Sequence, residues 1–244
     1  MSLMRKTKHV LMNKLKRVTC LCAAASISLL ALASLSGCEP NNHAVGDTGK
    51  ADDIVHDGID VEDIKLLIVG SKSASLDSKL LHLCEKSGLS AAYASVSDVK
   101  NANEAARDAI KSASEQPVSM ILINNINIDA SDSTDLGVKS NAGGAHVDSK
   151  ARESWIDALK YARFAGIPVA LVNPKNPPKD STLYAAKLYI FKDLDNQALF
   201  EFNRDNKSNV DKSGKIQHSS LLKIVQSLID NTPHSRDVII NDKN

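Results

Sequence analysis

Cysteine and aromatic residues are scarce in this chain of 244 residues. Of its four cysteines, Cys20 and Cys22 lie in an apolar segment near the start, and Cys38 ends a lipidation motif. Only Cys84 then remains as an ordinary thiol, which excludes a scaffold held by intramolecular disulfides. We expect Cys84 to act as a small apolar residue on a helix face. We expect the single tryptophan, Trp155, to lie on another helix face in the core.

An excess of charge of one sign is also lacking. The 30 basic and 29 acidic residues leave a formal net charge of +1. Domains that bind nucleic acid ordinarily concentrate Lys and Arg on one surface. We therefore expect no nucleic-acid partner.

The motifs of common catalytic and cofactor sites are missing. Gly70-Ser71-Lys72-Ser73 follows a predicted strand, but it lacks the Gly-Lys step and the earlier glycine of a phosphate-binding loop. The sequence has no dinucleotide-binding glycine motif after that strand and no Gly-x-Ser-x-Gly nucleophile turn. The histidines show no spacing typical of zinc ligands. We expect the chain not to be an enzyme.

The start of the chain has the pattern of a secretory signal peptide. Basic residues are followed by an uncharged, alanine-rich run over residues 18–34 and by Leu35-Ser36-Gly37-Cys38. Small residues before a cysteine are typical of a lipobox, whose cysteine receives acyl chains, palmitate among them. We predict a signal peptide over 1–37, lipidation of Cys38 and an extracytoplasmic protein anchored to the cell membrane. The alternative is an uncleaved signal anchor, although the run is short for a membrane span.

A polar segment separates this anchor from the first predicted strand. Residues 38–61 are rich in Asn, Asp, Gly and Lys and show little hydrophobic periodicity, which is typical of a flexible tether. A random coil of that length reaches roughly 25–30 Å. We expect the folded part to be held off the lipid surface by about this distance.

Short apolar runs then alternate with helical patterns. In the clearest unit, Trp155 begins a helical apolar face, Gly166 ends the helix, and Pro168 precedes the apolar run 169–172 and the polar Asn173. Such alternation predicts an α/β fold, a doubly wound parallel sheet of about five strands with helices on both faces. We assign residues 62–206 to this single lobe and treat 207–244 as a C-terminal extension. The predicted strands are 64–69, 91–96, 118–123, 169–172 and 188–191.

The unit Ala165-Gly166-Ile167-Pro168-Val169, with its strand and Asn173, resembles the first lobe of type I periplasmic binding proteins. It is most similar to the galactose/glucose-binding type, in which the fourth strand also ends in Asn and a proline-containing loop, here Asn173-Pro174-Lys175. The resemblance covers residues 64–203. It implies non-covalent sugar binding, with Asn124 and Asn127 as ligand contacts. The alternative for both asparagines is hydrogen bonding that ends a strand and caps the next turn.

Two further segments extend the resemblance. Thr232-Pro233-His234-Ser235-Arg236-Asp237 is similar to the sugar-binding turn of the family's second lobe, which implies ligand-binding roles for His234 and Asp237. Residues 209–217 resemble the family's calcium loop, but one ligand is charged and the later bidentate Glu is missing, so we expect at most weak calcium binding. The alternative is a polar turn. The implied metal ligands are Asn209, Asp211, Ser213, Lys215 and Gln217.

These patterns lead to two hypotheses for function. In the first, the chain is a surface-tethered lipoprotein that resembles the substrate-binding component of a sugar ABC uptake system, truncated or degenerate, with a small sugar and an ABC permease as partners. In the second, it is an interaction or structural lipoprotein that docks a partner protein through the open face of its lobe. An apolar open face favours the partner, whereas a polar one favours a lobe that stands alone.

Overall fold

A computed structural model describes residues 40–50, 53, 57–130, 149–190 and 217–241. In this part of the chain, seven parallel strands form one sheet in the order β2-β1-β3-β4-β5-β7-β6. The strands are β1 (Lys65–Val69), β2 (Ser90–Ala94), β3 (Met120–Asn124), β4 (Val169–Val172), β5 (Ala186–Tyr189), β6 (Gln217–Ser219) and β7 (Asp237–Ile240).

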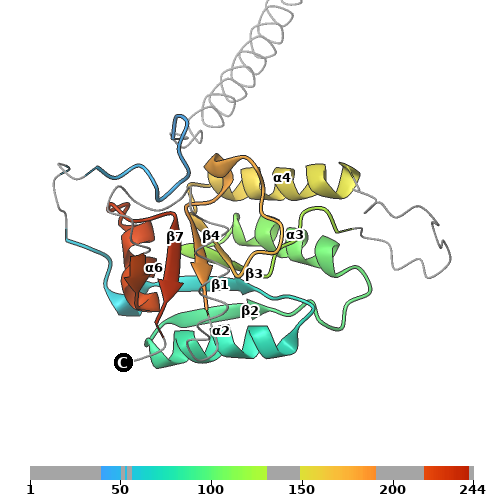
Figure 1. The fold of residues 1–244 in the computed structure, drawn as a ribbon, viewed down its shortest axis with the longest axis horizontal. Coiled ribbons are helices and arrows are strands. Elements are labelled where there is room, and N and C mark those ends of the chain that lie inside the picture. The colour runs from blue at the N-terminus through green and yellow to red at the C-terminus, as the bar shows by residue number, and fades with distance from the viewer. Residues whose placement is uncertain (1–39, 51–52, 54–56, 131–148, 191–216, 242–244) are drawn as a thin grey trace, which may run out of the picture. The chain divides into compact units, whose positions relative to one another are not determined.

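Helices cover both faces of this sheet, which confirms the predicted α/β class (Figure 1). The described helices are α2 (Ala74–Lys86), α3 (Ala102–Ala113), α4 (Ser149–Phe164) and α6 (Leu221–Ile229), with short 3-10 turns at η2 (Val61–Asp63) and η3 (Ser181–Leu183). Helices α2 and α6 pack on one face, and α3 and α4 pack on the other. None of the helices in the described ranges is long and apolar enough to cross a bilayer.

The number of strands differs from the five that the sequence predicts. Strands β6 and β7, with α6 between them, come from residues that the sequence analysis treated as a C-terminal extension. Strand β7 pairs with β5, and Val238, Ile240 and Leu228 are buried in the same core cluster as β1 and β3. Strand β5 pairs with β4 on one side and with β7 on the other, so these C-terminal residues complete the sheet.

Strands in the middle of the sheet are apolar on both sides because both sides are covered. All five residues of β3 are buried. Met120 and Leu122 pack towards α2 and α6, whereas Ile121 and Ile123 pack towards α3 and α4. This alternation follows the two-residue period of a strand.

Two glycines end helices, and the one after α4 does so as the sequence predicts. Gly88 after α2 and Gly166 after α4 have φ values of +69° and +72°, the left-handed conformation of a helix C-cap. Helix α3 begins after a turn. Its N-cap residue is Asn101, because residues 96–99 first form a turn in which the amide of Val99 donates to the carbonyl of Val96.

Residues 40–50 pack against the domain, although the sequence predicts a flexible tether over 38–61. Ala44 is 1% exposed and belongs to the core cluster. Gly46 approaches the backbone so closely that an added Cβ would lie 2.4 Å from the carbonyl oxygen of Leu228. The amide of Thr48 donates to Asn231 Oδ1 at 2.8 Å. The small side chain of Ala44 and the missing side chain of Gly46 allow this polar segment to pack closely against the domain.

The segment lies at the edge of the sheet where the strands begin. An added Cβ on Gly46 would also be 3.0 Å from the Pro168 side chain, directly before β4. Asp47 forms an ion pair with Arg236, directly before β7. We call this side the amino edge of the sheet, and the opposite side, where the strands end, the carboxyl edge.

Candidate functional site

The strand order creates a crevice at the carboxyl edge. From β1 the chain moves outwards to β2, and it then returns to place β3 on the other side of β1. The connections after β1 and β3 therefore diverge. In open α/β sheets, this switch point is where ligands bind.

A pocket of about 190 Å³ lies at this point. Its apolar wall comes from the end of β3 and the residues after it, from the segment after β2, and from the first turns of α3. These residues are Val96, Ala102, Ala106, Ile123 and Ile126. Polar and charged side chains close the remaining sides, so the pocket combines an apolar floor with a few hydrogen-bonding groups, as small-ligand sites usually do.

Two buried polar atoms in the pocket residues have no hydrogen-bond partner among the described residues. They are Asn124 Oδ1, at the end of β3, and Trp155 Nε1, on α4. Both residues are 3% exposed. Buried polar groups are nearly always hydrogen-bonded, so an acceptor and a donor without partners beside one pocket mark a place where a polar ligand would complete the missing bonds. Both atoms are buried, so a ligand in the pocket reaches them only after a small movement of the two side chains.

A buried carboxylate lies behind Asn124. Asp77, in the first turn of α2, is 1% exposed. It accepts hydrogen bonds from the Ser71 amide at 2.9 Å and hydroxyl at 2.9 Å, from Tyr93 Oη at 2.8 Å and from Asn124 Nδ2 at 2.7 Å. Gly70 leaves room for this network, because an added Cβ would lie 2.8 Å from Asp77 Oδ2.

This carboxylate determines which way the Asn124 amide points. An ionised carboxylate only accepts hydrogen bonds, so the NH2 group of Asn124 must face Asp77. The amide oxygen then points the other way. Reversing the amide would bring two acceptor oxygens to within hydrogen-bonding distance of each other.

Tyr93 supports the same carboxylate from β2. Partial burial raises the pKa of the Tyr93 phenol, and its hydrogen bond to Asp77 and the negative charge of that residue raise the pKa further. A hydrogen bond with Ser95 acts in the opposite direction. Tyr93 therefore remains a hydrogen-bond donor throughout the neutral pH range.

Asp77 is not among the site residues expected from the sequence, although the sequence contains a signal for it. Asp77 is three residues before Leu80 and seven before Cys84, and both of these belong to the predicted buried face of the helix. A carboxylate at that spacing must point inwards. A charged residue on a helix face that is otherwise apolar indicates a buried polar network, and here it identifies the network that supports the pocket.

The outer wall of the pocket is formed by the loops after β3 and β4. Asn127 forms an isolated bridge with Asn176, and its side-chain oxygen accepts from the Asp129 amide at 3.2 Å. Asp129 is bonded by Arg152 and by Asn176. The guanidinium of Arg152 is the main reason that the pKa of Asp129 lies below its usual range, and the bond from Asn176 adds to it.

Asn124 and Asn127 therefore line one pocket, and their roles as ligand contacts stay predictions. Asn173, the first polar residue after β4, has a different role. It has φ +44°, and its side-chain oxygen accepts from the Ile190 amide at 2.9 Å. It connects the ends of β4 and β5.

The other two predicted ligand contacts lie elsewhere. His234 Nε2 is 2.8 Å from the carbonyl oxygen of Gly46, and the histidine side chain is 1% exposed. Asp237 begins β7 and is bonded by Lys187 Nζ at 2.7 Å and by Tyr189 Oη at 3.1 Å. Neither residue lines the pocket with Asn124. His234 and Asp237 lie at the amino edge of the sheet, where β7 begins, whereas the pocket lies at the carboxyl edge.

Burial is the largest cause of a raised pKa at Tyr189, and the negative charge of Asp237 adds to it. The phenol thus stays protonated as a donor to Asp237. The group of Lys187, Tyr189 and Asp237 satisfies its own polar atoms, which is the behaviour of a structural cluster.

The predicted calcium ligands Asn209, Asp211, Ser213 and Lys215 lie outside the described residues. Gln217 is placed only as the first residue of β6. Within the described ranges, no group of three or more His, Cys, Asp or Glu side chains could hold a metal ion. Weak calcium binding stays a prediction.

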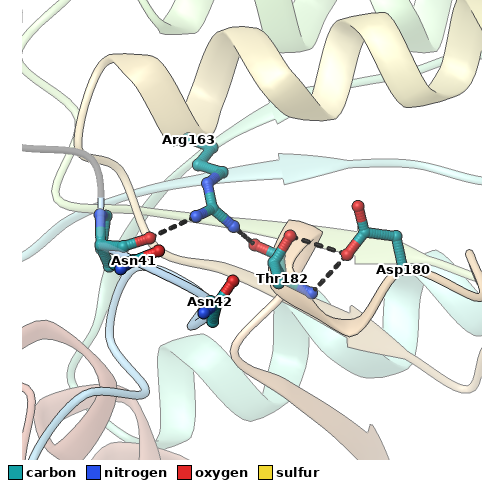
Figure 2. A pocket seen from close by; sticks show the side chains of 6 residues that line it. Asn41, Asn42, Arg163, Asp180 and Thr182 are labelled. Atoms are coloured by element: carbon teal, nitrogen blue, oxygen red, sulfur yellow. Dashed lines mark hydrogen bonds between the residues drawn. The ribbon is translucent and has the colours of Figure 1, made fainter.

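A second hollow, of about 580 Å³, lies at the amino edge and is shown in Figure 2. Arg163, from the end of α4, donates to the carbonyl oxygens of Pro40 and Thr182. Asp180 accepts from the amide and hydroxyl of Thr182, which is the main reason that its pKa is lowered. These bonds join Pro40 to the end of α4 and to the turn at Thr182, so they help to fix the segment 40–50 on the domain.

No family model matches the chain, and no curated protein matches it either. Among solved structures, a galactofuranose-binding protein shares 18% identity at a TM-score of 0.37, covering 72% of this chain and 56% of that one. A protein from Mycobacterium smegmatis in complex with β-D-fucofuranose shares 15% at 0.35, covering 73% and 54%.

The periplasmic component of an arabinose ABC transporter from Shewanella sp. ANA-3, bound to α- and β-L-arabinofuranose, shares 16% identity at a TM-score of 0.36, covering 73% of this chain and 53% of that one. The chain thus spans little more than half the length of each of the three structures. At such scores, the fold class rests on the strand order itself.

Proposed function

We propose that this chain is a lipid-anchored extracytoplasmic binding protein that holds a small polyhydroxylated ligand, a sugar or sugar derivative, in the pocket between the ends of β1 and β3. The ligand is held without covalent chemistry and is passed to a membrane permease of the ABC type. The sequence resemblance supports the class of ligand, and the pocket supports the place.

The observation that carries this proposal is a pair of buried polar atoms without a partner among the described residues, Asn124 Oδ1 and Trp155 Nε1. A hydroxyl group both donates and accepts, so neighbouring hydroxyls of one sugar satisfy the acceptor and the donor together. A buried polar atom without a partner costs about 1–3 kcal/mol. Recovering that energy from two atoms at once gives the ligand a specific orientation.

The size of the pocket indicates weak binding. Pockets for drug-sized ligands measure roughly 300–1,000 Å³ and bury most of the ligand surface. The pocket here measures about 190 Å³ and is open on one side. We expect dissociation constants near the millimolar range, which corresponds to about −4 kcal/mol.

The polarity of the carboxyl edge favours a ligand over a docked partner protein. Lys72 and Lys175 are exposed there, and Asn125 and Asn127 are partly exposed. An interface that buries a partner usually has an apolar core. By the criterion set from the sequence, these polar residues favour a lobe that stands alone.

The single tryptophan provides a direct test. Residues 38–244 with Cys38→Ser, labelled with 15N, are titrated with D-galactose, D-glucose and L-arabinose while the one indole N–H resonance is followed. We expect a saturable shift for at least one sugar, at millimolar concentration. An indole resonance that none of the three sugars moves contradicts the proposal.

Two substitutions locate the binding. Asn124→Ala removes the acceptor, and Trp155→Phe removes the donor while keeping an aromatic ring, so each weakens the binding that other pocket amides report. Ser219→Ala is the matched control, because Ser219 Oγ is also buried without a partner among the described residues but lies in β6, outside the pocket. An equal loss in all three variants would indicate general destabilisation.

A further inference from the structure

The charge around the pocket restricts the ligand further, provided that the proposed binding function holds. The pocket wall contains two charged side chains among the described residues, and both are cationic: Lys72, between β1 and α2, and Lys175, after β4. Both are exposed, and neither forms an ion pair with a described carboxylate. The outer end of the pocket is therefore positive.

The starts of two helices add to this positive character. Helix α2, of 13 residues, and helix α3, of 12 residues, begin at the carboxyl edge with Ser73 and Asn101 as N-cap residues. Neither side chain caps its helix by a hydrogen bond. The first amides of both helices thus have a partial positive charge that favours an anion nearby, although an acidic residue in each first turn, Asp77 in α2 and Glu104 in α3, offsets part of it.

The inner end of the pocket disfavours an anion and favours a hydrogen-bond donor. Asp77 is a buried negative charge behind Asn124, and the amide between them directs its oxygen away from that charge. An anionic group pressed against Asn124 would meet an acceptor oxygen with a carboxylate behind it. A hydroxyl donor fits there, because the amide oxygen of Asn124 and the negative charge of Asp77 both attract its hydrogen.

We propose that the ligand is a small hydroxylated acid, such as a uronic acid. Its hydroxyl groups point inwards to Asn124 and Trp155, and its carboxylate points outwards to Lys72 and Lys175. The two open polar atoms fix the inner end of the ligand, and the two lysines select the charge at its outer end.

A matched pair of sugars tests this selection. D-galacturonate and D-galactose differ by a carboxylate in place of a CH2OH group. Both are titrated into residues 38–244 with Cys38→Ser, with the indole N–H of Trp155 as the reporter. We expect galacturonate to bind about 5- to 10-fold more tightly at low salt, as two exposed ion pairs allow. In about 1 M salt, where the screening length is near 3 Å, the ratio falls below about 2.

The double variant Lys72→Met/Lys175→Met assigns the preference to the two lysines. It should bind both sugars with the affinity that the unmodified chain has for galactose. The matched control is Lys160→Met/Lys223→Met, which removes the same charge from exposed positions on α4 and α6 outside the pocket. The control should keep the preference for galacturonate.

Three outcomes overturn the inference, and they are distinguishable. Equal affinity for the two sugars, or a preference that survives in the pocket double variant, removes the role of the lysines and leaves the proposed binding function intact. An indole resonance that neither sugar moves removes the proposed function together with the inference. A preference that disappears equally in the control variant assigns it to net charge rather than to the pocket.

Discussion

Asp77 is surrounded by hydrogen-bond donors and has no cationic partner among the described residues. Donors from Ser71, Tyr93 and Asn124 replace the water that a carboxylate would otherwise bind. Each of these three residues comes from a different connection or strand. The carboxylate therefore holds together the ends of β1, β2 and β3, on which the pocket is built.

Replacing the carboxylate by an amide tests this role. Asp77→Asn keeps the shape but places a donor where donors already converge, so at least one buried group loses its partner. We expect a loss of about 1–3 kcal/mol in the free energy of unfolding, measured by urea denaturation. Asp108→Asn, at an exposed position of α3, is the control and should change stability by less than about 0.5 kcal/mol. If Asp77→Asn also changed the free energy of unfolding by less than about 0.5 kcal/mol, the hydrogen-bond network would not be needed for stability.

Cys84 illustrates a buried group with no role in the pocket. It is 1% exposed, and burial raises the pKa of its thiol to about 12. A group with a raised pKa keeps its proton below that value, so thiolate is nearly absent at pH 8. We expect no reaction of the native Cys38→Ser chain (38–244) with a disulfide reagent at pH 8 within minutes. Rapid reaction in guanidinium confirms that the thiol is present, whereas rapid reaction of the native chain would show that the helix opens readily.

At the scale of elements, the contact of residues 40–50 with the domain depends on glycine. Gly46 has φ +83°, and an added Cβ would meet the Leu228 carbonyl at 2.4 Å. Gly88 has a similar φ of +69°, but nothing lies within 4 Å of its added Cβ. The two positions thus share the same backbone strain and differ in the steric clash.

The corresponding alanine variants separate these two effects. Gly88→Ala should destabilise the chain by about 1–2 kcal/mol, which is the strain of a left-handed alanine. Gly46→Ala should in addition release residues 40–50, detected as new protease cleavage in that segment. Cleavage at equal rates in both variants would show that strain alone accounts for the effect.

The local elements could be predicted from the sequence because their signals are local. The helix end at Gly166, the position of Pro168 and the strand Val169–Val172 all follow from neighbouring residues. The pairing of β5 with β7 could not be predicted in this way, since it joins residues about 50 positions apart and neither strand has a signal for its partner.

The pocket also combines a residue that has a local sequence signal with one whose role depends on long-range packing. Asn124 was identified because it follows an apolar strand, whereas the open donor of Trp155 depends on how α4 packs against β3. The sequence analysis placed Trp155 in the core, and it is buried there, but its indole nitrogen belongs to the pocket residues. Packing across the sheet, rather than any motif, brings these two residues together.

At the scale of the whole molecule, the C-terminal residues form part of the sheet and of its hydrophobic core. Strand β7 covers the outer side of β5, and α6 buries Ile224, Val225 and Leu228 against the sheet. Residues 40–50 also rest on this part, through Asn231, His234 and Arg236. Removing it would expose the apolar face of β5 and release the N-terminal segment.

A chain that ends at residue 206, the boundary drawn from the sequence, should therefore lose cooperative unfolding. We expect a broad thermal transition and binding of a hydrophobic dye, compared with a sharp transition for residues 38–244. A cooperative transition of the shorter chain would show that the lobe is complete without β6 and β7.

The segment 40–50 also has a consequence for the geometry of a lipid anchor. If Cys38 carries lipid, a single residue, Glu39, separates it from Pro40, which is bonded to Arg163 at the amino edge. Two extended residues span at most about 7 Å, compared with the roughly 25–30 Å of a free coil. The domain would then stand on the bilayer with the starts of its strands downwards and its pocket opening upwards. A ligand would enter from the aqueous side, and a permease in the same membrane would have to reach past the depth of the sheet to collect it.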